Sequence, residues 1–422
     1  MDLIFIKRSF ISNSKKIRSL AILFFMAAQA FGQPSFFTYN TANSDLPENH
    51  ITCLVRDSTG LLWIGTDNGF ASFDGSSWDV YNESNSPMLD NQIRSLFVDH
   101  DGILWIGNFQ YGLTSKENNT WTYYTSGSSQ LPDDHVRSIT SDHNNRLLIG
   151  TTGGFAIKDG ANWDVFDSNN SQLQSNNIPA INAGQGDTIW IGTINGGLAR
   201  MVDTTFFIFD LDNSALPDNT ILDIESDKQG NIWLATPANG LVKYDHSDFV
   251  VYEMTNSNIP TNSLTAIELD ESDNIWIASN GSGLIKFDGN SWENYKAGNS
   301  GIPENNITTM LLENDSILWL GTSASGLVKV ELTDSTPTTA EFLNQVKGRS
   351  ICIYPNPAMD QITVKYNIHV KEILLTDIYG RKVLEMSISS NNVCETKDLN
   401  KLAPGIYFIH LDREFSSKFV KR

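Results

Sequence analysis

The chain has 422 residues, of which 49 are acidic and 29 basic, so its formal net charge is −20. Apolar residues make up 40% of the sequence, which is ample for a folded core in a chain of this length. A charge this negative argues strongly against a nucleic-acid partner, because DNA and RNA are bound through basic surfaces.

The first residues have the pattern of a secretory signal peptide. A basic lead that includes Lys15 and Lys16 precedes the apolar run LAILFFMAAQAFG, which is too short to span a bilayer stably and ends in small residues. We expect residues 1–32 to be a signal peptide, with cleavage after Ala30 or Gly32, while an uncleaved anchor stays open as the alternative. No later stretch is long enough to span a membrane.

Residues 33–332 are organised by a phrase such as GLLWIGT, which recurs at spacings of 42 or 43 residues. An aliphatic residue stands twelve positions before the central residue of each copy, and two aromatic residues stand upstream of that. The central positions of the phrase are Trp63, Trp105, Leu148, Trp190, Trp233, Trp276 and Trp319. Seven copies at this period indicate a repeat architecture, in which we expect the tryptophans to be packing residues.

Each repeat contains four short runs rich in β-branched and aromatic residues, such as ITCLVRD, LLWIGT, GFASFD and SWDVY. Separated by turn residues, they predict four antiparallel strands. Seven such sheets arranged radially make an all-β, seven-bladed β-propeller. The seventh repeat lacks its fourth strand, and PSFFTYN at residues 34–40 supplies one, so we expect the N-terminal strand to close the last blade.

The repeat resembles the two-component regulator propeller repeat. The first copy carries that pattern as Asn49, Ile51, Leu54, Asp57, Gly60, Leu62, Trp63, Ile64, Gly65, Thr66 and Gly69. Two copies depart from it, with Leu148 in place of tryptophan and Gly184 in place of aspartate. In that family such propellers often form the periplasmic, oligosaccharide-binding part of hybrid sensor kinases. This sequence shows no kinase domain and no transmembrane segment, so the signalling role is not carried over.

The repeat pattern stops at about residue 333. We expect a linker over residues 333–349 and a small β-sandwich domain over residues 350–422, built from runs such as QITVKYN, KEILLTD and GIYFIHL. This segment resembles the C-terminal sorting domain of type IX secretion cargo. The matching residues are Tyr354-Pro355-Asn356-Pro357, Asp377, Gly380-Arg381, Leu402, Gly405-Ile406-Tyr407 and Lys418-Phe419-Val420-Lys421-Arg422.

That resemblance implies a route of export and the secretion machinery as a partner. The signal peptide would direct the chain across the inner membrane, and the type IX secretion machinery would then carry it across the outer membrane. The expected location is therefore outside a Gram-negative cell, either secreted or attached to the outer-membrane surface.

The repeated aspartates of the first hairpin raise the question of metal binding. Asp57 and its counterparts in other repeats suggest calcium, but they lack the alternating acidic spacing of calcium loops. We expect them to cap their turns, and we predict no metal and no cofactor.

Cys352 and Cys394 share the C-terminal domain, and the sequence leaves open whether they form a disulfide in an oxidising compartment.

The sequence contains none of the motifs HExxH, GxSxG or a phosphate-binding glycine loop, so no catalytic residue is predicted. Ligands of propellers usually lie over the axis, among the connections entering the innermost strands and the loops after the second strands. Only the second repeat has aromatic residues in that loop. The candidate ligand-binding residues are Phe109, Gln110, Tyr111, Arg94, Arg137, His135 and His50.

Aromatic rings beside arginines and histidine suit a sugar, such as a uronic acid whose carboxylate pairs with arginine. The sequence thus favours a non-enzymatic binding module with a glycan ligand. A polysaccharide lyase or hydrolase is one alternative, and it requires His, Tyr, Arg or acidic residues close together over the axis. A protein-binding adhesion scaffold is another, and it requires a large exposed apolar patch. The arginines could instead only pair with acidic neighbours.

Overall fold

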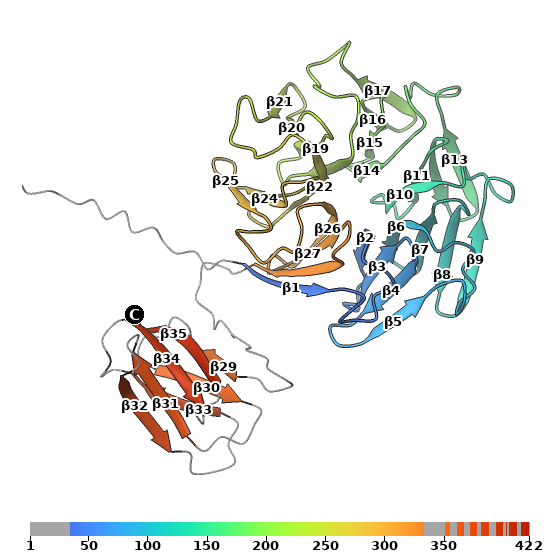
Figure 1. Cartoon of the computed structure of the whole chain (residues 1–422). Coiled ribbons are helices and arrows are strands. Elements are labelled where there is room, and N and C mark those ends of the chain that lie inside the picture. The colour runs from blue at the N-terminus through green and yellow to red at the C-terminus, as the bar shows by residue number, and fades with distance from the viewer. Residues whose placement is uncertain are drawn as a thin grey trace, which may run out of the picture.

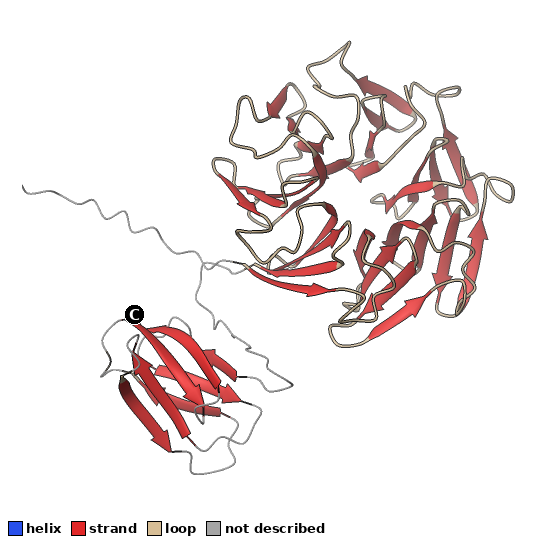
Figure 2. Ribbon diagram, in the orientation of Figure 1, coloured by secondary structure: helices blue, strands red, loops and turns tan. Residues whose placement is uncertain are grey.

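The computed structural model describes residues 34–332 without a break and, in the C-terminal region, seven strands with Arg381, Leu399 and Leu402 beside them. The predicted signal peptide (1–32) and linker (333–349) lie outside the described residues. Figure 2 shows strands joined by loops, and the part of the chain that is described contains no helix. The all-β prediction is confirmed.

Residues 34–332 form seven four-stranded antiparallel sheets, arranged as the blades of a propeller (Figure 1). The innermost strands are β2 (Ile51–Arg56), β6 (Ile93–Val98), β10 (Val136–Ser141), β14 (Ala180–Ala183), β18 (Asp223–Ser226), β22 (Leu264–Leu269) and β26 (Ile307–Glu313). The second strands are β3 (Leu62–Thr66), β7 (Leu104–Asn108), β11 (Leu147–Thr151), β15 (Thr188–Gly192), β19 (Ile232–Ala235), β23 (Ile275–Ser279) and β27 (Ile317–Thr322). The third strands are β4 (Gly69–Phe73), β8 (Leu113–Glu117), β12 (Phe155–Asp159), β16 (Leu198–Val202), β20 (Leu241–Tyr244), β24 (Leu284–Phe287) and β28 (Leu327–Glu331). The outermost strands are β5 (Trp78–Tyr81), β9 (Thr120–Tyr124), β13 (Asn162–Phe166), β17 (Thr205–Phe209), β21 (Phe249–Tyr252), β25 (Trp292–Tyr295) and β1 (Ser35–Tyr39). We number the blades 1 to 7 in the order of their innermost strands.

The ring is closed by β1. This strand pairs with β28 in a register that runs from Ser35 opposite Glu331 to Tyr39 opposite Leu327, which makes it the outermost strand of blade 7. Each innermost strand contacts that of the next blade, and β26 in turn contacts β2. The prediction of a last blade closed by the N-terminal strand is confirmed.

The repeated tryptophans are packing residues, as expected. All six at the centre of the phrase are at most 7% exposed, and Leu148, which replaces the seventh, is fully buried. They lie within hydrophobic clusters that each join neighbouring blades. Because every blade buries its faces against its neighbours, the phrase must recur in each blade and carries no information about a ligand.

The hairpin acids cap their turns and also hold the tryptophans. In blade 5, Asp227 Oδ1 accepts hydrogen bonds from the backbone N–H groups of Gln229 at 3.1 Å and Asn231 at 2.8 Å, while Oδ2 accepts one from Trp233 Nε1 at 3.1 Å. In blade 3, where Leu148 has no such donor, Arg146 Nε donates to Asp142 at 2.6 Å instead. The capping expectation is confirmed.

Replacing Asp227 by alanine is expected to lower the free energy of unfolding by about 2 kcal/mol, because a buried indole N–H and two turn amides lose their acceptor. Urea unfolding followed by tryptophan fluorescence measures this. Asp101→Ala removes an exposed carboxylate from the corresponding hairpin of blade 2 and should change stability by less than about 0.5 kcal/mol. Equal losses in the two variants would contradict the prediction.

One glycine recurs for a steric reason. Gly69, which begins the third strand of blade 1, has φ +100°, and a Cβ added there would overlap the carbonyl oxygen of Tyr81 on the outermost strand. The same overlap occurs at the equivalent glycine of every other blade. Only glycine combines this backbone conformation with so close an approach, so the position marks where each third strand must begin.

The C-terminal region forms two sheets, with strand orders β29-β30-β33 and β32-β31-β34-β35, in the manner of a small sandwich. The strands are β29 (Ile351–Tyr354), β30 (Gln361–Tyr366), β31 (Glu372–Asp377), β32 (Lys382–Ser387), β33 (Cys394–Asp398), β34 (Gly405–Leu411) and β35 (Phe415–Lys421). Cys352 and Cys394 both stand opposite Lys365, on either side of β30. Two interstrand spacings separate their Cα atoms by about 10 Å, beyond the range of a disulfide.

Candidate ligand-binding site

The seven predicted ligand-binding residues belong to blades 1 to 3. The start of an innermost strand and the end of the second strand are neighbours in an antiparallel pair, so the connections at both positions open on the same face of the ring. His50 immediately precedes β2, Arg94 lies on β6, Phe109, Gln110 and Tyr111 follow β7, His135 immediately precedes β10, and Arg137 lies on β10. We call the region that they surround the mouth.

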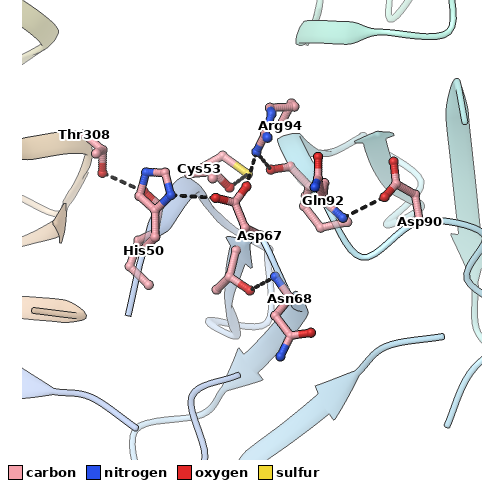
Figure 3. A network of polar contacts seen from close by, with 12 residues as sticks. His50, Cys53, Asp67, Asn68, Asp90, Gln92, Arg94 and Thr308 are labelled. Atoms are coloured by element: carbon pink, nitrogen blue, oxygen red, sulfur yellow. Dashed lines mark hydrogen bonds and ion pairs between the residues drawn. The ribbon is translucent and has the colours of Figure 1, made fainter. Parts of the chain in front are cut away.

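Asp67, in the loop after β3, links two of these residues. One of its carboxylate oxygens lies 2.7 Å from His50 Nδ1, and the other accepts a hydrogen bond from Arg94 Nη1, as Figure 3 shows. Burial opposes ionisation of Asp67, but the hydrogen bonds from Arg94 and His50 outweigh it and keep the pKa of this carboxyl below its usual value. The charge of Arg94 is therefore balanced within the protein.

Phe109 lies between a guanidinium and an imidazole. The Arg94 guanidinium carbon is 4.8 Å from the centre of the Phe109 ring, and the ring centres of Phe109 and His135 are 4.4 Å apart at an interplanar angle of 66°. A cation over an aromatic face and an edge-to-face ring pair are both favourable contacts. Together they hold the Phe109 ring in place.

Arg137 differs from Arg94 in its partner. Its Nη1 donates to the side-chain oxygen of Asn177 at 2.7 Å, and no ion pair to Arg137 is found within residues 34–332. Desolvation lowers the pKa of Arg137, and the nearby charge of Arg94 lowers it further. Desolvation likewise lowers the pKa of His135, with Arg137 and Arg94 adding to the effect and Asp133 opposing it. His135 is thus neutral near pH 7, beside two arginines of which only one faces a carboxylate.

The other two predicted residues lie at the edge of this cluster. Tyr111 is 48% exposed, and the backbone N–H of Gln110 donates to Asp90 at 3.1 Å. The structure therefore brings together five of the seven predicted residues through Asp67, Phe109 and the neighbouring charges, and leaves the Tyr111 ring open to solvent.

A polar pocket of about 670 Å³ adjoins Asp67 on the side of blade 7. Its lining residues are Thr41, Pro47, Glu48, Asn49, His50, Asp67, Asn68, Ser323 and Ala324. The volume is in the range of small-molecule sites, and carboxylate, amide and hydroxyl groups dominate the lining. Such a lining offers acceptors and donors to hydroxyl groups.

Sequence reasoning missed Asp67 and Asn177. A signal for Asp67 existed, because it is the only acidic residue at its position of the repeat, where the other blades have Phe109, Thr152, Ile194, Pro237, Asn280 and Ser323. Asn177 precedes the innermost strand of blade 4, and its contact with Arg137 depends on how adjacent blades pack. No pattern within one repeat reveals that contact.

Three carboxyl groups with raised pKa lie on innermost strands across the ring. Burial raises the pKa of Asp223 to about 6. Burial also raises that of Glu268 to about 8, with the charge of Asp223 adding to the effect. Burial and then the charges of Glu268 and Asp223 raise the pKa of Glu225. These groups occupy blades 5 and 6, away from the mouth.

No cluster of His, Cys, Asp or Glu suited to a metal ion occurs among the residues that the structure describes. Among the same residues, no helix is long and apolar enough to cross a bilayer.

Two family models match the chain. The model described as Two component regulator propeller matches residues 45–68, 87–110 and 215–238, which lie in blades 1, 2 and 5. The model described as Secretion system C-terminal sorting domain matches residues 352–422. With the fold, they define the class of an exported repeat propeller. The chain contains two-component regulator propeller repeats and a C-terminal sorting domain of the type IX secretion system, and the sorting domain indicates a protein that is secreted or attached to the outer-membrane surface.

Solved structures show the same fold at low identity. The extracellular domain of a hybrid two-component system from B. thetaiotaomicron is 21% identical with a TM-score of 0.62, and the match covers 92% of this chain and 57% of that one. PorZ, a surface component of the type IX secretion system of Porphyromonas gingivalis, is 18% identical with a TM-score of 0.58, covering 91% of this chain and 61% of PorZ.

A third neighbour is an enzyme. Virginiamycin B lyase from Staphylococcus aureus is 14% identical with a TM-score of 0.59, covering 71% of this chain and all of the lyase. The chain thus spans less than two thirds of the first two structures. Identities this low carry the fold alone. No curated protein matches the chain.

Proposed function

We propose that the propeller is a non-enzymatic binding module that holds an acidic sugar of an extracellular polysaccharide at the mouth. The observation that carries the proposal is Arg137, a partly buried guanidinium whose side-chain partner is the neutral amide of Asn177. A partly desolvated cation without a counter-charge favours an anionic ligand, and the planar guanidinium matches a carboxylate with two parallel hydrogen bonds.

The surroundings of Arg137 favour a sugar over a small anion. The Phe109 ring is fixed between Arg94 and His135, and Tyr111, two residues further along the same loop, is exposed, so this loop offers two aromatic rings in the blades that also carry Arg137. Aromatic faces pack against the C–H faces of sugar rings, while the polar pocket next to Asp67 offers hydrogen-bond partners for hydroxyl groups. Export places the protein where polysaccharides are met.

Replacing Arg137 by alanine is expected to weaken binding of uronic-acid oligosaccharides at least about tenfold, because a charge-assisted pair is worth about 1.5–3 kcal/mol. Arg137→Lys should recover only part of that affinity, since lysine cannot form the planar double contact. Isothermal titration of the purified chain with uronic-acid and neutral oligosaccharides measures both effects.

The matched control is Lys296→Ala, which removes an exposed cation in the connection after β25 of blade 6. Its affinity should equal that of the wild type if binding is local to the mouth. Unchanged binding to a glycan array after Tyr111 and Arg137 are replaced together would refute the proposal.

One observation favours catalysis as a second candidate. His50 Nδ1 lies 2.7 Å from Asp67 Oδ2, the arrangement in which a carboxylate orients an imidazole as a general base, and the pair lines the polar pocket. A polysaccharide lyase or hydrolase acting there would release unsaturated products or new reducing ends. Product release that disappears in His50→Ala would establish it, and the absence of products would leave binding alone.

The adhesion-scaffold alternative rests on the outer surface of blades 4 and 5. Phe207, Leu211, Val250 and Met254 are 44–59% exposed, and they lie on or directly after β17 and β21. Exposed apolar side chains on the outermost strands of neighbouring blades are candidates for protein contacts. Loss of surface adhesion in Phe207→Ser with Met254→Ser, with unchanged glycan binding, would favour this alternative.

A further inference from the structure

Asp67 and Phe109 occupy the same position of the repeat, directly after the second strand, in blades 1 and 2. Arg94 and Arg137 likewise share a position, one residue into the innermost strands of blades 2 and 3. Because the blades repeat their geometry, the loop residue of one blade stands beside the innermost strand of the next. By position in the repeat, Phe109 therefore corresponds to Asp67 and Arg137 corresponds to Arg94, while the Phe109 ring itself contacts Arg94 and His135.

The two arginines therefore define two subsites, one in which the guanidinium is paired with a carboxylate of the protein and one in which it is not. The Arg94 subsite already holds a carboxylate, that of Asp67, whose second oxygen faces His50 (Figure 3). At the repeat position equivalent to Asp67, the next blade has the apolar Phe109, and within residues 34–332 the hydrogen-bond partner of the Arg137 guanidinium is the amide oxygen of Asn177. The contact between Asp67 and Arg94 thus displays, within the protein, the kind of contact that a ligand carboxylate would make at Arg137.

The polar pocket lined by Asp67 indicates which kind of sugar could lie next to the uronic acid. Glu48 and Asp67 both line it, with Asn68 and Ser323. Carboxylates and amides accept hydrogen bonds from sugar hydroxyls, but two carboxylates repel a second anionic group. The pocket suits a neutral sugar.

We infer that Asp67 is a resident carboxylate that closes the Arg94 subsite, so that the mouth selects oligosaccharides in which a single uronic acid is flanked by neutral sugars. This inference rests on the proposed function and names its ligand more closely. A run of adjacent uronic acids would bring a second carboxylate against Asp67, whose negative charge would oppose it.

The test compares two probes by isothermal titration. One is an oligosaccharide in which uronic acid alternates with a neutral sugar, and the other is an oligogalacturonide of adjacent uronic acids. We expect the wild type to bind the alternating probe about tenfold more tightly or better. In Asp67→Asn, which keeps the side-chain shape and a hydrogen-bond acceptor for Arg94, affinity for the oligogalacturonide should rise at least about tenfold and that for the alternating probe about threefold at most.

Phe109→Asp provides the converse change. It puts a carboxylate in the blade 2 loop at the repeat position that Asp67 holds in blade 1. There we expect it to compete with a ligand carboxylate for the arginines of the mouth, so binding of both probes should be lost. Thermal melting of each variant checks that it is folded. Wild-type binding with the same discrimination in Asp67→Asn would overturn this inference alone. Absence of binding to either probe, by the wild type and by Asp67→Asn, would overturn the proposed function and this inference with it.

Discussion

Replacing Phe36 and Tyr39 together by alanine is expected to lower the free energy of unfolding by about 4 kcal/mol or more, since each change removes a partly buried aromatic ring. Tyr39 packs against Phe73 and Trp319 at ring-centre distances of 5.2 and 6.3 Å, so it joins blade 7 to blade 1. Phe36 packs into the core of blade 7 and lies 6.3 Å from the ring of Tyr295 in blade 6. The change therefore weakens both interfaces of the closing blade.

The same strand provides the control. Phe37 lies between the two and is 46% exposed, so Phe37→Ala removes a similar ring from β1 while leaving the interfaces intact. It should change stability by less than about 1 kcal/mol. Urea unfolding measures all variants, and comparable losses in Phe37→Ala and the double variant would show that β1 contributes only strand pairing.

Replacing Glu268 by glutamine is expected to raise the melting temperature at pH 8 by about 5 °C. The pKa of Glu268 is raised to about 8 in the folded propeller, and those of its neighbours Asp223 and Glu225 are raised as well. Removing the charge of Glu268 should stabilise the folded state by roughly 2 to 3 kcal/mol, which is less than its full pKa shift implies because the side chain is partly exposed. In a domain this large, that stabilisation corresponds to the stated change in melting temperature.

The direction of the pH dependence follows from linkage. The folded state binds protons on these carboxyls more tightly than the unfolded state does, so their protons stabilise the fold at low pH. That contribution is fully present below the ordinary carboxyl pKa of about 4 and is lost as the pH rises through about 6 to about 8. The wild type should thus lose stability between pH 5 and 9 in this part of its profile.

Thermal melting across that pH range, for the wild type, Glu268→Gln and Glu83→Gln, tests the prediction. Glu83 is exposed in the connection after β5, so its replacement should leave the profile unchanged. A profile of Glu268→Gln that matches the wild type would show that the three carboxyls are hydrated as well in the folded state as in the unfolded one.

The fold could be predicted from the sequence because packing repeats with it. Trp63 and its equivalents are buried by the packing of neighbouring blades, and Gly69 and its equivalents meet the same steric constraint. The same residue pattern therefore recurs in all seven repeats. The missing fourth strand of the last repeat then identifies β1 as its replacement. Each of these signals depends on contacts that are the same in all blades.

The candidate site was predicted only in part, because its contacts are not repeated. Arg94, Phe109 and His135 were found as departures from the repeat, and they do lie together. Asp67 was missed because its loop reads as an ordinary polar turn, and Asn177 because it belongs to the next blade. A single sequence shows which residues depart from the pattern, but not which departures in neighbouring repeats touch.

The pairing of β1 with β28 also sets an order of assembly. The strands within each of blades 1 to 6 are joined by short connections, so their strand pairs form between residues that are close in the sequence. Blade 7 cannot, because its outermost strand lies almost three hundred residues before the strand it must meet. Because this pairing has the greatest sequence separation in the propeller, we expect it to form last. In such a sequence of events, an open ring of blades with β1 unpaired would precede the closed propeller.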